Sequence, residues 1–299
     1  MRPSAKPVLR LIQTEFRLKT GQTIEYRIDW LTITKPDLEV WYERELQMLL
    51  HDYDGSVHAE KCAPPKGYSV AVKNEYGAVA AASGDRQGVL IQWSGQALTL
   101  VDAVLIAETA LSNDWRITRL DVNADFIGFD TTVEDYKQEY EAGQCLTVAR
   151  KWDENKSSPN GHTFYIGSRK SEYFMRIYNK TASEARFTDI ADLPELWVRC
   201  ELRLGDERAR SAFQIVKFYG LNTAVPMLLR GYADFPNIEE YVNMAEYPIS
   251  TIGKGAKQTN TVKWILDSVL PALIREVRLD PDLWREIKER VETEITLTK

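Results

Sequence analysis

The chain has 299 residues, of which 44% are hydrophobic and 27% are charged, and this composition argues against extensive disorder. Its formal net charge of −6 does not by itself indicate a nucleic-acid partner, although an acidic chain can still carry a local basic groove. The three cysteines are widely spaced and form no CxxC pair, so neither a disulfide framework nor a zinc cluster is expected. Because no secretory leader or long apolar run is found, we expect a cytoplasmic protein with no membrane association.

The first half of the chain predicts alternating strands and helices. A run of β-branched and aromatic residues predicts a strand at 24–34, and the spacing of Leu and aromatic residues predicts a helix at 36–52 that starts at Pro36. The elements expected next are strands within 67–73, 76–82 and 88–94, a helix at 99–111 and an alternating strand at 116–126. This order indicates a mixed α+β fold.

The second half predicts more strands and then mainly helices. The expected elements are a helix at 132–142, strands at 145–150, 162–167, 173–179 and 196–204, a polar loop at 152–161, and helices at 206–219, 221–230, 259–277 and 281–294. The segment 247–260 mixes Pro, Gly, Ser and Lys and reads as a linker. We therefore expect an N-terminal extension at 1–24, a main domain at 25–246, and a linker with a helical hairpin at 247–299.

Three of the predicted strands each carry a polar face. Side chains alternate along a strand, which sorts each segment into an apolar and a polar set. The polar sets are Arg119, Asp121, Asn123 and Asp125; Trp197, Arg199, Glu201 and Arg203; and Phe174, Arg176, Tyr178 and Lys180. If the three strands are neighbours in an antiparallel sheet, these sets converge on one open surface while helices cover the other face.

Such a surface would combine two carboxylates, a phenol and several cations, which suits phosphoryl transfer. Carboxylate oxygens suit Mg²⁺ or Mn²⁺, and nearby cations favour the phenolate of a nucleophilic tyrosine. The alternative is an ordinary solvated sheet face on which opposite charges pair. Strand alternation alone favours this alternative, so the motifs must decide.

Five motifs occur in order along the chain: IDWLTIT at 28–34, WSGQAL at 93–98, TRLDVNADF at 118–126, TFYIGSRKSEYFMRIYNK at 163–180 and WVRCELRL at 197–204. Together they resemble the replication initiation factor family. This family includes rolling-circle initiators of plasmids, initiators of some filamentous phages and relaxases of some integrative conjugative elements. The resemblance covers roughly residues 25–220, and the motif at 163–180 is its most specific part.

The resemblance implies a fold related to the HUH endonucleases, with an antiparallel sheet, helices on one face and the active site on the open face. It also implies a metal-dependent endonuclease in which a tyrosine attacks one DNA strand and leaves a 5′-phosphotyrosine and a free 3′-OH. Carried over by motif, Tyr178 is the nucleophile, Asp121 and Glu201 are the ligands of Mg²⁺ or Mn²⁺, and Arg176 and Lys180 orient the phosphate. The weaker accessory candidates are Asp125, Arg199, Arg203 and His162. No pair of histidines with HxH spacing occurs in the sequence, so metal binding cannot rest on two histidines, which gives the carboxylates more weight.

The region from Lys151 to Lys180 has more cations than carboxylates and has aromatic residues between them. Such a region suits the binding of single-stranded DNA, because cations follow the DNA backbone while aromatic rings stack on the bases. The candidate DNA-binding residues are Lys151, Lys156, Arg169 and Lys170. We therefore expect single-stranded origin DNA as the partner.

The sequence also allows two other classes of protein. A non-catalytic DNA-binding regulator of replication or recombination would bind DNA without forming an adduct, and a structural module would bind neither DNA nor metal. A homodimer would supply a second tyrosine for a second strand transfer. The C-terminal helices could pack on the main domain or recruit a host helicase.

Overall fold

The computed structural model describes residues 14–17, 21–56, 58–82, 88–147, 149–156, 161–244, 284–285 and 288. Backbone contacts divide the chain into two units, Met1–Ile252 and Gly253–Lys299. The predicted linker and the helix predicted at 259–277 lie outside the described residues, as does most of the helix predicted at 281–294. A helix long and apolar enough to cross a membrane is not found in the described part of the chain.

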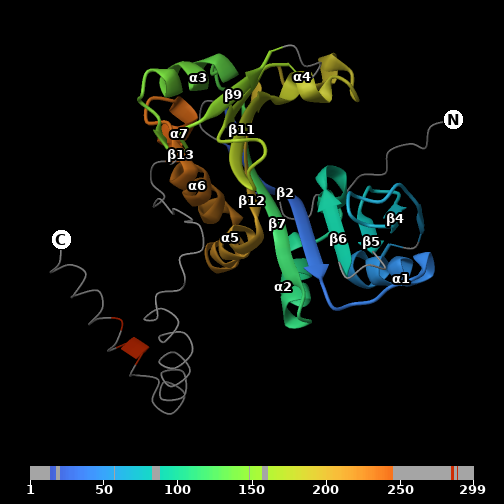
Figure 1. Cartoon of the computed structure of the whole chain (residues 1–299). Coiled ribbons are helices and arrows are strands. Elements are labelled where there is room, and N and C mark those ends of the chain that lie inside the picture. Colours follow the sequence, from blue (N-terminus) through green and yellow to red (C-terminus); the bar gives the residue numbers. More distant parts are fainter. Residues whose placement is uncertain are drawn as a thin grey trace. The chain divides into compact units, whose positions relative to one another are not determined.

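The first unit is built on a large sheet in which all of the described strand pairs are antiparallel (Figure 1). Its strand order is β3-β4-β5-β6-β2-β7-β12-β11-β10-β9, with β1 paired to β2. The strands are β1 (Thr14–Arg17), β2 (Thr23–Lys35), β3 (Ala59–Lys61), β4 (Val70–Asn74), β5 (Val79–Ala82), β6 (Val89–Ser94), β7 (Arg116–Ile127), β9 (Trp152–Asn155), β10 (Thr163–Ile166), β11 (Tyr173–Asn179) and β12 (Trp197–Gly205). Two short strands, β8 (Leu146–Thr147) and β13 (Ala233–Asp234), form a separate pair.

Helices cover the apolar face of this sheet, which confirms the expected α+β class. The helices are α1 (Glu43–Asp54), α2 (Ala103–Ser112), α3 (Val133–Glu141), α4 (Lys180–Glu184), α5 (Asp206–Tyr219), α6 (Leu221–Tyr232) and α7 (Glu239–Asn243), with 3₁₀ turns η1 (Gly95–Thr99) and η2 (Ile190–Asp192). Helices α5 and α6 pack on β7 and β12, and α1 packs on β4 and β5 (Figure 1).

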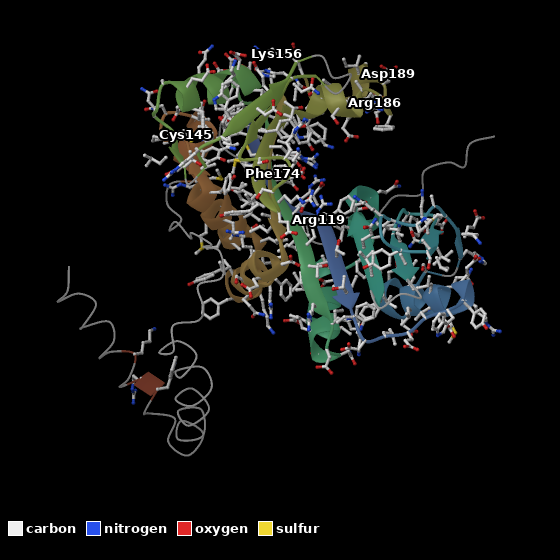
Figure 2. The ribbon with its side chains drawn as sticks, in the orientation of Figure 1. Arg119, Cys145, Lys156, Phe174, Arg186 and Asp189 are labelled. Atoms are coloured by element: carbon white, nitrogen blue, oxygen red, sulfur yellow. The ribbon has the colours of Figure 1, made fainter. Side chains whose placement is uncertain are left out.

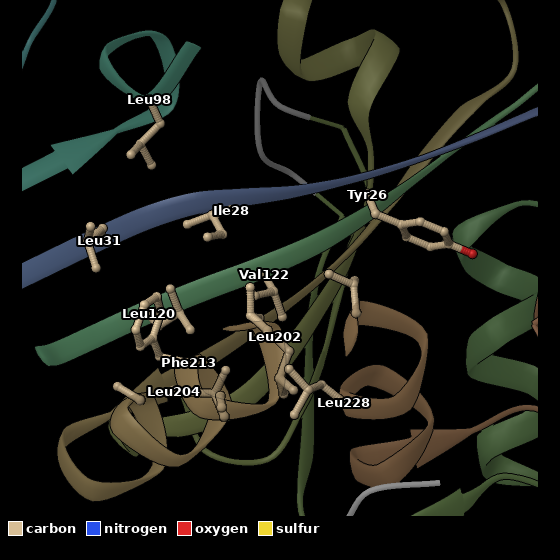
Figure 3. Close-up of a cluster of buried hydrophobic side chains, with 14 of the residues drawn as sticks. Tyr26, Ile28, Leu31, Leu98, Leu120, Val122, Leu202, Leu204, Phe213 and Leu228 are labelled. Carbon is tan, nitrogen blue, oxygen red and sulfur yellow. The ribbon is translucent and has the colours of Figure 1, made fainter. Parts of the chain in front are cut away.

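The core lies between the central strands and α5 and α6. Val122 of β7 and Leu202 of β12 face Phe213 and Leu228 on these helices (Figure 3), and all four side chains are fully or almost fully buried. The apolar members of the alternating strands therefore point to the helices, as the sequence predicts. The polar members must lie on the other face, which positions the candidate site.

Several predicted elements differ in their bounds. Where a strand is expected at 145–150, the structure has the short β8, which pairs with β13 outside the large sheet, and the helix expected at 99–111 starts at Ala103. The helix expected to start at Pro36 starts at Glu43, because the carboxylate of Glu45 accepts hydrogen bonds from the backbone N–H groups of Trp41 (2.9 Å) and Tyr42 (3.2 Å) and fixes the first turn there. The polar loop expected at 152–161 begins with a strand, β9, which pairs with β10 and forms the edge of the sheet. Short polar strands of this kind carry little period-2 signal.

Gly167 ends β10 with a positive φ of +92°, and a Cβ there would clash with the hydroxyl of Tyr232. Gly77 has a similar φ of +95° and open space around its Cβ position. Both Gly→Ala changes strain the backbone, at a cost on the order of 1 kcal/mol. Because only the Cβ at position 167 also meets Tyr232, Gly167→Ala should lower the free energy of unfolding measurably more than Gly77→Ala in urea titrations. Equal losses would show that the contact with Tyr232 does not constrain this turn.

Candidate active site

The three strands with polar faces are adjacent in the order β7-β12-β11. Across β11 and β12, Arg176 is the Cα partner of Glu201 and Tyr178 is the partner of Arg199. Across β12 and β7, Glu201 is the partner of Asn123. The structure therefore brings the candidate nucleophile, its candidate cations and both candidate metal ligands onto one face of the sheet.

On this face the carboxylates lie beneath partly exposed arginine side chains. The carboxylates of Asp121, Asp125 and Glu201 are almost fully buried, with exposed fractions of 1%, 0% and 2%. Guanidinium groups cover them, because a carboxylate removed from water needs a charged partner or several hydrogen-bond donors. Nitrogen atoms gather around Arg119 on this side of the central strands (Figure 2).

Tyr178 and Arg176 share one carboxylate oxygen. Arg176 Nη2 donates to Glu201 Oε2 at 2.6 Å, and the Tyr178 hydroxyl lies 3.5 Å from the same oxygen. The guanidinium of Arg176 also lies 5.2 Å from the centroid of the Tyr178 ring. Burial raises the pKa of Tyr178 well above its usual value, although Arg199 and Arg176 oppose this rise. A raised pKa favours the protonated phenol, so use of Tyr178 as a nucleophile requires a proton acceptor.

Glu201 has the properties of such an acceptor. Burial raises its pKa to about 7, and the carboxylates of Asp29 and Asp121 add to the rise while Arg176 opposes it. Burial also raises the pKa of Asp121, against the opposing effect of Arg119, whose Nε donates to Asp121 Oδ1 at 2.9 Å. A carboxyl group that titrates near neutral pH can accept a proton and release it again.

Asp125 and Arg199 form the most buried ion pair of the face. Arg199 donates to both carboxylate oxygens of Asp125 at 2.7 Å, and Trp197 Nε1 donates to Asp125 Oδ1 at 2.9 Å. Burial alone would raise the pKa of Asp125, but Arg199, Arg27 and the indole together lower it. Asp125 therefore stays ionised and holds Arg199 beside Tyr178.

Asp29 is a member of this site that the sequence reasoning missed. The pairing of β2 with β7 shifts between Ile28 and Trp30, so Asp29 is the extra residue of a β-bulge. The bulge places Asp29 on the polar face, where its Oδ1 accepts a hydrogen bond from Arg199 Nη1 at 2.8 Å. The motif IDWL carries a signal of this bulge. Apolar residues on one face of a regular strand are two positions apart, but Ile28 and Leu31, which are both buried, are three positions apart.

Lys180 was expected at the end of the strand, but β11 ends at Asn179 and Lys180 is the first residue of α4. The side chain of Asn179 caps this helix by accepting from the backbone N–H of Ala182 at 2.8 Å. Lys180 pairs with Glu184 one helical turn away, and its Nζ lies 5.8 Å from the centroid of the Trp197 ring. Lys180 therefore stays on the polar face, although the helix and not the strand positions it.

His162 lies on the opposite side of the sheet from Tyr178. Its Nε2 lies 3.3 Å from Glu154 Oε2 and its Nδ1 lies 3.9 Å from Glu134 Oε2 of α3. Within the described ranges, these three side chains form the one group of His, Cys, Asp and Glu whose ligand atoms all lie within 4.8 Å of one another. Lys137 and Lys156 already pair with the two carboxylates, which leaves less charge for a metal ion.

The four candidate DNA-binding cations are divided between two places. Arg169 lies in the turn after β10, stacks over the Tyr165 ring at 5.0 Å and pairs with Asp153. Lys156 lies beside α3 (Figure 2) and pairs with Glu134 at 3.0 Å. Lys151 and Lys170 are exposed near the Arg169 turn. Lys156 is therefore part of the helix-side cluster and not of the polar face.

The polar face also offers oxygen donors of the kind that a hard divalent ion prefers. Asn123 is fully buried between Asp121 and Asp125, and its Nδ2 donates to Asp125 Oδ2 at 3.2 Å. Its Oδ1 has no hydrogen-bond partner. An unpartnered amide oxygen therefore lies beside Asp121 and opposite Glu201. Oxygen atoms of this kind are the ligands that Mg²⁺ and Mn²⁺ prefer, although Arg119 and Arg176 already pair with the two carboxylates.

The chain matches a known protein family. Residues 115–273 match the family described as replication initiation factor. This match includes β7, β11 and β12, which carry the polar face.

Two individual proteins are similar to the chain. The "Putative DNA relaxase NicK" of Bacillus subtilis (strain 168) is 29% identical in an alignment of 184 residues that covers 56% of this chain. The chain spans about half of that relative, 52% of its length. A solved rolling circle replication initiator protein from Geobacillus stearothermophilus is 21% identical and has a TM-score of 0.56 over 76% of this chain and 92% of that one. The latter similarity confirms the expected fold.

Removal of the Asp125 carboxylate should destabilise the protein strongly. Asp125→Asn leaves the buried guanidinium of Arg199 with Asp29 as its remaining carboxylate partner, and loss of one member of a buried pair costs about 3–5 kcal/mol. The matched control is Asp153→Asn, which breaks an exposed pair with Arg169 worth less than about 1 kcal/mol. Urea titrations at pH 7 measure both.

The same pair predicts a pH dependence. The pKa of Asp125 is lowered in the folded protein, so its contribution is complete above the unfolded pKa near 3.9 and is lost as pH falls through the folded value. The difference in unfolding free energy between wild type and Asp125→Asn should therefore shrink below about pH 4. A constant difference down to pH 2 would contradict the lowered pKa.

Proposed function

The chain belongs to the replication initiation factor family, and on this premise we propose that it nicks and rejoins one strand of DNA through a tyrosine. The observation that carries the proposal is the placement of Tyr178 beside Glu201 and between the guanidinium groups of Arg176 and Arg199. The reaction would start rolling-circle replication of a plasmid, phage or integrated element, or start conjugative transfer.

In the proposed reaction, Tyr178 Oη attacks the phosphorus of one phosphodiester. The new bond joins the tyrosine oxygen to the 5′-phosphate, and the bond from phosphorus to the 3′-oxygen breaks. The 3′-oxygen leaves with a proton as a free 3′-OH, and its return attack on the phosphotyrosine reseals the strand. Bond energy is conserved in the covalent adduct, so no nucleotide cofactor is needed for rejoining.

Glu201 is the proposed acceptor of the phenol proton. Its Oε2 lies 3.5 Å from the Tyr178 hydroxyl, and burial raises its pKa to about 7 when no metal ion is bound, whereas a bound ion would lower this pKa. Catalytic hydrogen bonds are often long before substrate binds and tighten in the complex. The protonated acid could then return its proton to the leaving 3′-oxygen.

Arg176 and Lys180 are the proposed phosphate-binding cations. The Arg176 side chain is 39% exposed, and its Nε is buried without a hydrogen-bond partner. It can therefore reach a phosphate on the surface while remaining over the Tyr178 ring. Charge-assisted hydrogen bonds from such cations stabilise the charge that develops on the phosphate oxygens.

Asp121, Glu201 and Asn123 are the residues proposed to hold Mg²⁺ or Mn²⁺. A bound ion of this kind would polarise the scissile phosphate and favour the phenolate. Glu201 and Asp121 each raise the cost of ionising the other, and a cation between them would relieve this repulsion.

Single-stranded origin DNA is the proposed substrate. Arg169 and Tyr165 are proposed to bind the DNA strand where it continues along the sheet face. Release of a circle requires a second strand transfer, which a second copy of this chain could perform with its own Tyr178. A host helicase and the predicted C-terminal hairpin at 247–299 are proposed to act after the nick.

A non-catalytic DNA-binding protein is the second candidate. The observation that favours it is the burial of Tyr178, which is only 8% exposed and has a raised pKa. Such a protein would bind the same DNA and form no covalent adduct with any divalent ion.

Substitution of the proposed nucleophile separates these candidates. With Mn²⁺ and a supercoiled plasmid that carries the replicon's own origin, Tyr178→Phe should lose nicking and the covalent adduct by at least about a thousandfold. Tyr165→Phe is the matched control, because Tyr165 lies on the same face and faces Arg176 across the strand pair. Gel electrophoresis of the plasmid and of labelled adduct measures both. Adduct formation by Tyr178→Phe at the wild-type level would refute the proposed nucleophile.

Metal binding distinguishes the two clusters of potential ligands. Glu201→Gln should weaken Mn²⁺ binding about tenfold or more, because one charged ligand of the proposed site is lost. Glu154→Gln, which alters the cluster of Glu134, Glu154 and His162, should leave the affinity unchanged. Electron paramagnetic resonance of free Mn²⁺ measures both affinities. The opposite result would place the ion on the helix side of the sheet.

A further inference from the structure

A cavity of about 250 Å³ opens beside the proposed nucleophile. Its walls come from β2, η1, the start of α2, α4 and β12. Arg199 and Lys180 belong both to this cavity and to the candidate active site, since Arg199 is the Cα partner of Tyr178 and Lys180 follows Tyr178 by two residues. A group seated in the cavity would therefore lie next to the phosphodiester that Tyr178 attacks.

The charges in the cavity walls are already paired. Asp29 accepts from Arg199, Glu184 pairs with Lys180, and the Asp102 carboxylate caps α2 by accepting from two backbone N–H groups at 3.0 Å. The three cations and the three carboxylates of the walls balance, so the cavity as a whole has no net charge. A neutral ligand is favoured.

The remaining wall is mainly apolar. Leu98 and Val101 lie on one side, and the indole of Trp197 is held in place by its hydrogen bond to Asp125. Pockets for drug-sized ligands begin near about 300 Å³, so this smaller cavity suits a single ring system. Lys180 Nζ lies over the Trp197 ring, 5.8 Å from its centroid, so a base would stack on the other face of this ring.

The cavity also offers groups that recognise the edge of a base. Gln96 is exposed at the mouth and carries an amide donor and an amide acceptor on one side chain. Paired donor and acceptor groups of this kind bind the edges of nucleobases with sequence preference. Arg27 lies on the same wall.

We propose that this cavity binds one unpaired nucleobase next to the scissile phosphate and so selects the nick site. The proposal rests on the proposed function, because it assigns the base to the DNA strand that Tyr178 attacks. Cations outside the cavity would hold the backbone without regard to sequence, while the cavity would supply the sequence preference.

Fluorescence anisotropy at fixed salt measures the affinity of the protein for three single-stranded oligomers, each made of twelve copies of one nucleotide, dA, dC or dT. Wild type should prefer one oligomer about tenfold, the discrimination of one well-placed base contact. Val101→Trp, which fills the cavity, and Gln96→Ala, which removes the exposed amide, should both bring the three affinities close together. Leu105→Trp is the control, because Leu105 is exposed on α2 and does not line the cavity.

Two results would overturn the proposal. One is equal or absent binding of the three oligomers by wild type. The other is a preference among the three oligomers that stays unchanged in both Val101→Trp and Gln96→Ala. Gln96 is exposed, so Gln96→Ala still tests the proposal if Val101→Trp fails to fold. Tyr178→Phe should keep the base preference, so failure of the cavity proposal is distinguishable from failure of the proposed nucleophile.

Discussion

The pairing of buried carboxylates with guanidinium groups on one face of the central sheet is the constraint on which the rest of the structure depends. Asp121, Asp125 and Glu201 are almost completely removed from water, and each contacts an arginine. Unpaired, each would cost several kcal/mol. A shift of one residue in the register of β7 or β12 would turn these charges toward α5 and α6, so the same alternation that builds the apolar core fixes the polar face.

The paired charges divide into two kinds of group. Asp125 is ionised and holds Arg199 and Trp197 rigidly, because its cations outweigh the effect of burial. Glu201 lies among other carboxylates, and its pKa rises to about 7. Neighbouring carboxylates whose environments move their pKa values apart can perform different tasks. We propose that Asp125 positions Arg199, and that Glu201 either accepts the phenol proton or, together with Asp121, binds a metal ion that favours the phenolate.

Much of the fold was predictable because β7, β11 and β12 alternate strictly, and the motif RIYNK identified Tyr178 as a candidate. Other features depend on tertiary contacts. The burial of the polar face could not be read from alternation, since a solvated strand and a strand covered by arginines have the same pattern. Asp29 reaches the site only through a β-bulge, and Lys180 reaches it from the first turn of α4. His162 directly precedes β10, whose first residue, Thr163, is the Cα partner of Tyr178. Because successive side chains point to opposite faces, His162 lies on the other face.

The central claim is that Tyr178 forms the covalent bond to DNA. Its most direct test is mass spectrometry of the proteolysed adduct formed on the replicon's own single-stranded origin. The account predicts a peptide that contains RIYNK, with a 5′-phosphate of the cleaved strand attached to Tyr178 and a free 3′-OH on the other fragment. An adduct on a different residue, or one linked through a 3′-phosphate, would contradict it.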